Sequence, residues 1–82
     1  MQDEYKVIDV KDIKKGMIIY IPVDPNSPMN KYEVIDQIYN PDRNIKEFIV
    51  IHILNDFNKK QVNLKFNINV NHNILVKHNR YW

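Results

Sequence analysis

The sequence predicts an all-β fold: a meander of five to six antiparallel strands that closes into a small barrel, with at most one short helical turn. Thirteen Ile and eight Val stand against three Leu and no Ala, and β-branched side chains favour strands over helices. Several segments alternate apolar and polar residues, and the short connections between them favour antiparallel neighbours. Because five short strands in 82 residues bury a core best by curling up, residues 1–82 are expected to form one β-barrel domain.

The N-terminal part is expected to contain a weak strand, a turn and a clear strand. Residues 5–10 are interpreted as a short strand or an irregular lead-in, and residues 12–16 as one helical turn or a β-turn. Gly16 ends this turn because glycine adopts a positive φ readily. The first clear strand is predicted over residues 17–23. Its alternation places Met17, Ile19, Ile21 and Val23 on one face and Ile18 and Tyr20 on the other.

The second strand is predicted over residues 31–39. It follows the longest loop of the chain, residues 24–30, in which Pro, Asn and Asp mark turns. Asp36 interrupts the apolar side of this strand and indicates a β-bulge. That side holds Tyr32, Val34 and Ile38.

The third and fourth strands have the strongest patterns. Residues 45–54 are apolar on both faces, which is typical of a central strand. Their faces hold Ile49, Ile51 and Ile53, and Phe48, Val50 and His52. Residues 61–71 alternate without interruption, with Val62, Leu64, Phe66, Ile68 and Val70 inward and Gln61, Asn63, Lys65, Asn67, Asn69 and Asn71 outward. A tight turn over residues 71–73, where Asn tolerates a left-handed conformation, leads to the last strand, residues 74–76.

Residues 12–21, with the sequence DIKKGMIIYI, precede the long loop. This stretch resembles the entry into the first strand of SH3-like and KOW-type barrels. It lacks the Gly-rich spacing of a KOW motif, and Met17 stands where such barrels often carry an acidic residue. The resemblance implies an SH3-like barrel, and it implies no particular function because one fold hosts many functions.

Composition excludes several classes of function. The chain has no Cys, no Thr, one Ser and one Gly, so it cannot form a disulfide, a thiolate nucleophile, a Cys-ligated metal site or a Gly-rich phosphate loop. No apolar run approaches the ~20 residues of a membrane-spanning helix, and the acidic N-terminus lacks the basic and apolar regions of a secretory signal. We therefore expect a cytoplasmic protein with no cofactor, no membrane contact and no small-molecule substrate.

Three His residues are the only candidates for acid-base or metal chemistry. His52 is expected as a half-buried strand residue, and His72 and His78 as surface residues at the two ends of the last strand. A barrel this small fills its interior with its own side chains, which leaves no shaped pocket for a substrate. We therefore expect no catalytic residue, no metal ligand and no enzymatic activity.

Apolar residues on both faces of several strands predict a protein-binding surface. One small barrel cannot enclose all of them, and Tyr and Trp are common anchors of protein contacts; alternatively, the N-terminal segment or a short helix covers them. The favoured interpretation is a non-catalytic binding module, an accessory or inhibitory factor that binds another protein or itself. Its predicted contact residues are Tyr20, Tyr39, Phe48, Tyr81 and Trp82.

The alternative function is nucleic-acid binding by the C-terminal half. Residues 1–43 carry a net charge of −2 and residues 44–82 one of +4, and basic groups beside aromatic side chains suit single-stranded nucleic acid. The outward amides of residues 61–69 are suited to pairing with base edges. The residues of this alternative are Phe57, Lys59, Lys60, Lys65, Lys77, Arg80 and Trp82.

The residue usage also predicts an A/T-rich gene. Ile, Asn, Lys, Tyr and Phe make up 43 of the 82 residues, and Arg occurs twice. A low-GC bacterium, its plasmid or its phage is the simplest source of such a chain. The same codon bias is sufficient to explain the twelve Asn, which weakens any functional interpretation of them.

Overall fold

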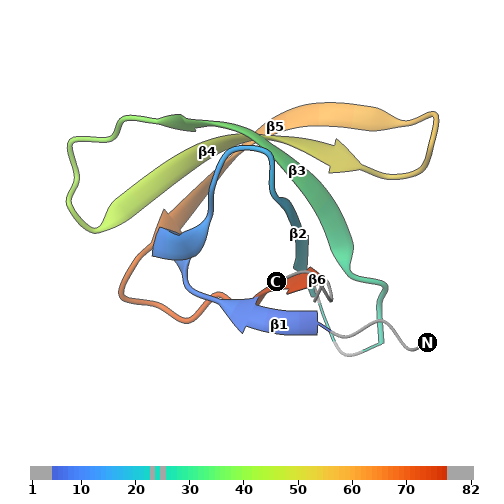
Figure 1. Cartoon of the computed structure of the whole chain (residues 1–82), viewed down its shortest axis with the longest axis horizontal. Helices are drawn as coiled ribbons and strands as arrows, with labels where there is room; N and C mark the ends of the chain where they lie inside the picture. Colours follow the sequence, from blue (N-terminus) through green and yellow to red (C-terminus); the bar gives the residue numbers. More distant parts are fainter. Residues whose placement is uncertain (1–4, 23, 25, 78–82) are drawn as a thin grey trace.

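Six antiparallel strands form one sheet in the computed structural model, which describes residues 5–22, 24 and 26–77 (Figure 1). Their order across the sheet is β1-β6-β2-β3-β4-β5. The all-β antiparallel fold is therefore confirmed, and the helical element among these residues is a short 3-10 turn, η1 (Val10–Asp12). The strands are β1 (Tyr5–Ile8), β2 (Ile18–Ile21), β3 (Asn30–Ile38), β4 (Ile45–Ile53), β5 (Lys59–Asn67) and β6 (Ile74–Lys77).

The sheet is open. Strands β2 to β5 are consecutive neighbours, and β6 returns to lie between β2 and β1. β1 and β5 are thus the two edges of the described sheet, and the predicted closure into a barrel is not confirmed. Figure 1 shows that the sheet curls instead: β3, β4 and β5 cross over β1, β2 and β6, and β3 links the two groups. The curl encloses a core while leaving both edge strands unjoined.

The β-bulge lies where Asp36 indicated it. The register between β3 and β4 shifts between Val34 and Asp36, so that Val34 lies opposite Val50 and Ile38 opposite Glu47. Val50 and Glu47 are an odd number of residues apart, so they point to opposite faces of the sheet. The prediction that Ile38 shares a face with Val34 is therefore wrong, because the extra residue of the bulge reverses the alternation behind it.

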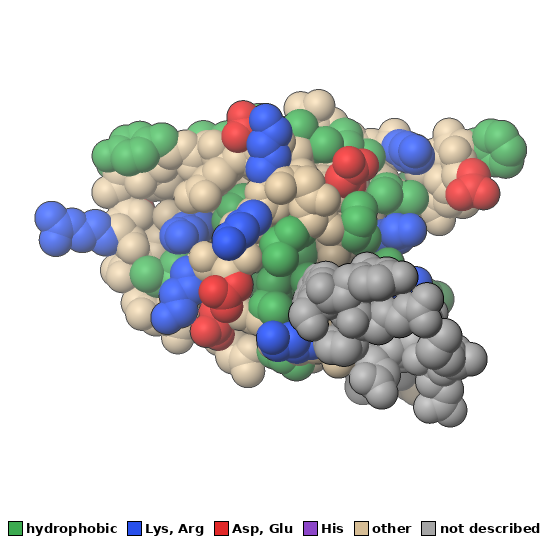
Figure 2. All heavy atoms as spheres, in the orientation of Figure 1, with side chains coloured by type: hydrophobic (Ala, Val, Ile, Leu, Met, Phe, Trp, Pro, Cys, Tyr) green, Lys and Arg blue, Asp and Glu red, His purple; other side chains and the backbone are tan. Residues whose placement is uncertain are grey.

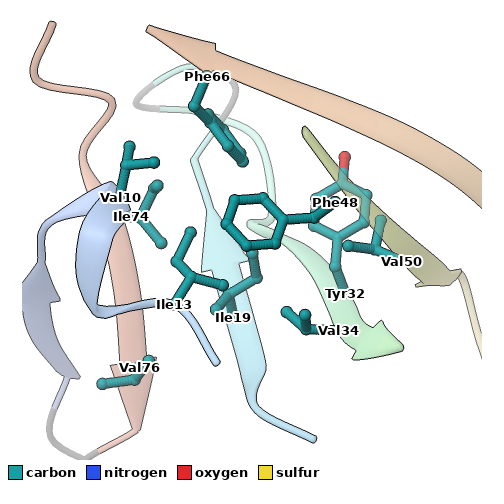
Figure 3. Close-up of a cluster of buried hydrophobic side chains, with 10 residues drawn as sticks. All are labelled: Val10, Ile13, Ile19, Tyr32, Val34, Phe48, Val50, Phe66, Ile74 and Val76. Atoms are coloured by element: carbon teal, nitrogen blue, oxygen red, sulfur yellow. The ribbon is translucent and has the colours of Figure 1, made fainter. Parts of the chain in front are cut away.

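The core fills the concave face of the curled sheet (Figure 3). Phe48 and Val50 of β4 are 1% and 0% exposed, and the ring centroid of Phe48 lies 6.1 Å from that of Phe66 on β5. β4 pairs with β3 on one side and β5 on the other, which confirms its predicted central position. The buried cluster is Val10, Ile13, Ile19, Tyr32, Val34, Phe48, Val50, Phe66, Ile74 and Val76.

β2 is shorter than predicted at both ends. Ahead of it, the Gly16 N–H donates to the carbonyl of Val34 and the Val34 N–H donates to the carbonyl of Met17, each over 2.8 Å. Two residues thus face one across the pair, as in a bulge that begins with a left-handed glycine. Gly16 has a φ of +91°, which confirms the predicted positive φ.

β5 also ends earlier than predicted. The alternation holds through Phe66, which is buried, but Ile68 and Val70 are 41% and 52% exposed. The chain turns after Asn67, whose side chain accepts the N–H of Asn69 over 2.9 Å and whose carbonyl accepts that of Val70 over 3.1 Å. The prediction that Ile68 and Val70 point inward is wrong because local hydrogen bonding of Asn competes with the strand ladder.

Candidate functional site

The turn between β4 and β5, residues 54–58, presents the most exposed large apolar side chain of the described chain. Phe57 is 95% exposed and Leu54 61%. The Asn55 Oδ1 accepts the N–H groups of Phe57 and Asn58 over 2.8 and 2.9 Å, and the Leu54 N–H donates to the Asn58 carbonyl over 2.9 Å. We call this segment the Phe57 tip. Because its backbone is already held by hydrogen bonds, a partner that covers Phe57 does not have to order the turn.

Tyr39 lies at the other end of the molecule. It is 88% exposed in the connection between β3 and β4, where Asn40 caps the N–H of Asp42 and Asp42 caps that of Asn44, each over 2.9 Å. Figure 1 shows this connection and the Phe57 tip at opposite ends of the long axis. The nine residues of β4 between them span about 30 Å. Tyr39 and Phe57 therefore belong to separate surfaces.

Two of the predicted protein-contact residues are buried. Phe48 belongs to the core, so the prediction that it is a surface contact is wrong: of the two apolar faces of β4, the one with Phe48 faces inward. Tyr20 is 8% exposed, also against prediction, because the Tyr5 ring packs edge-on against it at 5.3 Å and the Lys77 Nζ lies 5.7 Å from its ring centroid. Tyr81 and Trp82 lie outside the described residues.

The outer face of β4 carries the apolar row that the sequence predicted, but it is only half exposed. Ile49 and Ile51 are of intermediate burial. In the β5 register, Asn63 lies opposite Ile49 and Gln61 opposite Ile51, so polar residues flank this row on the β5 side. This row is therefore a weaker candidate contact surface than the Phe57 tip.

The residues proposed for nucleic-acid binding do not form one surface. Phe57, Lys59 and Lys60 gather at the tip, but Lys65 lies at the far end of β5, directly opposite Glu47, and Lys77 lies on β6. Figure 2 shows the Lys and Arg side chains of its face as separate groups with acidic and uncharged side chains between them. Arg80 and Trp82 lie outside the described residues.

The outward amides of β5 and the following turn are used within the protein. The Asn63 Nδ2 donates to the Glu47 carboxylate over 3.1 Å, and the Asn69 Nδ2 donates to the Asn44 Oδ1 over 3.1 Å. Asn73 has a φ of 55°, as predicted for the last turn. Other Asn residues cap turns: the side-chain oxygens of Asn40, Asn55, Asn67 and Asn71 each accept a backbone N–H two residues further on. The sequence interpretation of the Asn by codon bias or base recognition missed these caps, which the Asn-rich connections could have indicated.

The described His residues have structural contacts. The His52 ring lies 4.7 Å from that of Tyr32. The His72 Nε2 donates to the Asn67 carbonyl over 2.9 Å, and its ring packs on Phe66 at 5.0 Å. His78 lies outside the described residues. Within residues 5–22, 24 and 26–77, no three His, Asp or Glu side chains are grouped closely enough to hold a metal ion.

A surface hollow of about 360 Å³ lies beside the Phe57 tip, between Leu54, His52 and the loop before β3. Asp24 organises that loop. Its carboxylate accepts the Ser27 hydroxyl and the Asn26 N–H, each over 2.8 Å. These donors, the hydroxyl first, lower the pKa of the Asp24 carboxyl from its ordinary value of 3.8.

Comparisons with protein-family models, with curated proteins and with solved structures found no match for this chain. In the part of the chain that the structure describes, no helix has the length and apolarity needed to cross a bilayer. The functional interpretation therefore depends on the geometry of the chain itself.

Proposed function

We propose that the protein is a non-catalytic binding module, an accessory or inhibitory factor that acts by contacting another protein through the Phe57 tip. The observation that carries this proposal is a Phe side chain 95% exposed on a turn that the hydrogen bonds of Asn55 and Asn58 hold in place. We also propose that the fold is an open relative of the SH3-like barrels that residues 12–21 resemble, and the all-β sheet curled around a single core supports this proposal. The curled sheet provides a rigid base for the Phe57 tip.

Energetics favour Phe57 as an anchor. Complete burial of a Phe side chain contributes about 1.5–3 kcal/mol, and a few well-packed residues of this kind dominate most protein interfaces. Leu54 extends the apolar surface at the base of the turn, and the hollow beside it offers a recess for a partner side chain. The contacts of His52 and His72 with aromatic rings and a backbone carbonyl support structural roles for both.

Binding of single-stranded nucleic acid is the second candidate function. Phe57 with Lys59 and Lys60 at one tip combines a stacking surface with cations. The Glu47 opposite Lys65 and the internal use of the Asn63 amide disfavour an extended binding track along β5. Salt separates the two functions, because affinity for phosphates falls steeply with salt concentration and an apolar contact changes little.

Quantitative co-purification from lysate of the source cells tests the proposal. The wild-type chain, Phe57→Ala and the control Val70→Ala are compared; Val70 is also exposed and apolar but lies beyond the other end of β5. We expect a protein that is retained by the wild type and by Val70→Ala in high salt and is lost with Phe57→Ala. Equal retention by Phe57→Ala, or capture of nuclease-sensitive material that salt removes, would contradict the proposal.

A further inference from the structure

The hydrogen-bond phase of β5 identifies which backbone groups its free edge presents. Opposite residues of an antiparallel pair alternate between those that exchange two backbone bonds and those that exchange none. At one end of the β4–β5 ladder the Leu54 N–H donates to the Asn58 carbonyl, and at the other the Ile68 N–H donates to the Asn44 carbonyl. Both pairs continue the register of the ladder. Even-numbered residues of β5 therefore bond to β4, and odd-numbered residues direct their N–H and C=O groups away from it.

Asn67 confirms this phase independently. Its carbonyl, on an odd-numbered residue, accepts the His72 Nε2 and the Val70 N–H, so it points away from β4. The turn after β5 thus covers the edge at Asn67. The edge-directed backbone groups that remain belong to Lys59, Gln61, Asn63 and Lys65, and β5 has no partner other than β4 among the described strands.

This edge lacks most of the features by which proteins prevent strand addition. β5 has nine residues, contains no Pro and keeps an uninterrupted register with β4, whereas many protected edges are short, bulged, covered or interrupted by Pro. The protective feature that β5 does have is its lysines, which repel a second basic strand. On the core side of the edge, Val62 and Leu64 are only half-buried. An added strand would bond to the free backbone groups and cover these two side chains.

Charge indicates what kind of strand the edge accepts. β5 carries Lys59, Lys60 and Lys65, and no Asp or Glu occurs in residues 57–82. The Glu47 carboxylate reaches β5, where it accepts the Asn63 Nδ2 over 3.1 Å, but one carboxylate beside three lysines leaves this edge with a net positive charge. Edge lysines oppose pairing of β5 with a second copy of itself and attract carboxylates placed opposite them.

We propose that the free edge of β5 binds an extended acidic segment of a partner protein as an added antiparallel strand, with apolar residues beside Val62 and Leu64 and carboxylates beside the lysines. The inference rests on the proposed protein-binding function and adds the conformation and charge of the partner. Such strand addition gains affinity from main-chain hydrogen bonds and specificity from alternate side chains.

A designed peptide tests this directly. The probe Glu-Ile-Thr-Val-Thr-Glu-Glu, acetylated and amidated, pairs in order with residues 65 to 59, and its charge-reversed control replaces each Glu by Lys. Binding is measured by fluorescence polarisation and by ¹H–¹⁵N spectra of the full chain. We expect the acidic peptide to bind at least about tenfold more tightly than the control, and the amides of Gln61, Asn63 and Lys65 to become protected from hydrogen exchange on binding.

N-methylation of the peptide distinguishes strand addition from simple charge attraction. The two Thr lie opposite Asn63 and Gln61, so their N–H groups face β5, whereas those of the Ile and Val face solvent. Methylating both Thr nitrogens should weaken binding by about tenfold or more, because two hydrogen bonds are lost. Methylating the Ile and Val nitrogens should change the affinity by no more than about twofold.

A protein variant gives the reciprocal test. Asn63→Pro removes an edge-directed N–H without removing a bond to β4, a position at which edge strands tolerate Pro, and Asn63→Ala is its control. We expect Asn63→Pro to lose peptide binding and Asn63→Ala to retain it. The N-methylated peptides test the same bonds with the unmodified protein if Asn63→Pro does not fold.

Three outcomes would overturn the inference. Equal affinity for the acidic and charge-reversed peptides would contradict the acidic character of the partner. Equal effects of the two N-methylation patterns would contradict binding by strand addition. A wild-type dimer in analytical ultracentrifugation that Asn63→Pro abolishes would assign the edge to a second copy of this chain. Because the peptide ends opposite Lys59, its failure leaves the Phe57 tip untouched, and the Phe57→Ala capture experiment reports on the tip alone.

Discussion

Replacement of Phe48 by Ala tests the placement of the core. The side chain is 1% exposed, and its ring lies 6.1 Å from that of Phe66. Truncating a buried Phe to Ala costs about 3–5 kcal/mol, through lost burial and the cavity that remains. At about 0.05–0.15 kcal/mol per residue, a domain of this size has a total stability of about 4–12 kcal/mol. Phe48→Ala therefore removes a large part of the stability or all of it.

A graded variant keeps the measurement within range. Phe48→Leu leaves a smaller cavity and should lower the free energy of unfolding by about 1–2 kcal/mol. Phe57→Ala is the matched control, since the same side chain is 95% exposed there and its loss should change stability by less than about 0.5 kcal/mol. Urea denaturation followed by circular dichroism gives both values. An unchanged midpoint for Phe48→Leu, or a large loss for Phe57→Ala, would refute the inward placement of this face of β4.

Three further predictions concern the turns and the end of β5. Gly16→Ala should cost about 1–2 kcal/mol of unfolding free energy from backbone strain alone, since no atom beyond the adjacent residues lies within 4 Å of an added Cβ; an unchanged urea midpoint would contradict this. His72→Ala should lower stability by about 1–2 kcal/mol, because it removes the bond to Asn67 and the contact with Phe66; a stability equal to that of the wild type would argue against a structural role. Ser27→Ala should raise the pKa of Asp24 toward 3.8, since the hydroxyl is the main cause of its lowered pKa. The carboxylate's bonds stabilise the loop above that pKa and are lost as pH falls through it, and an NMR titration that gives the same Asp24 pKa in both proteins would exclude the Ser27 contribution.

The candidate site was only partly predictable. Phe57 was identified from the sequence as an exposed aromatic side chain beside lysines, but as part of a nucleic-acid surface that also needed Lys65 and Lys77. The structure separates these residues along the sheet and places Glu47 opposite Lys65. The free edge of β5 was not predicted, since the expected barrel closure would have removed it.

Local pattern determined the strands. The excess of Ile and Val, the alternation through Phe66, the apolar character of both faces of β4, the positive φ of Gly16 and the bulge at Asp36 all follow from neighbouring residues, and the structure bears each of them out. These features depend on backbone preferences within a few residues, so one segment contains all the information they need.

Tertiary structure decided the rest. Both faces of β4 are apolar, so the sequence pattern does not indicate which of them faces the core. The packing of Phe48 against Phe66, in the buried cluster that also contains Val10 of η1, places its face inward. The bulge was visible from Asp36, but its effect on Ile38 depends on the pairing with β4. Whether β5 meets β1 depends on how far the sheet curls, which is set by contacts between residues distant in the chain. Periodicity within one strand contains no information about such contacts, because each of them needs a partner from another strand.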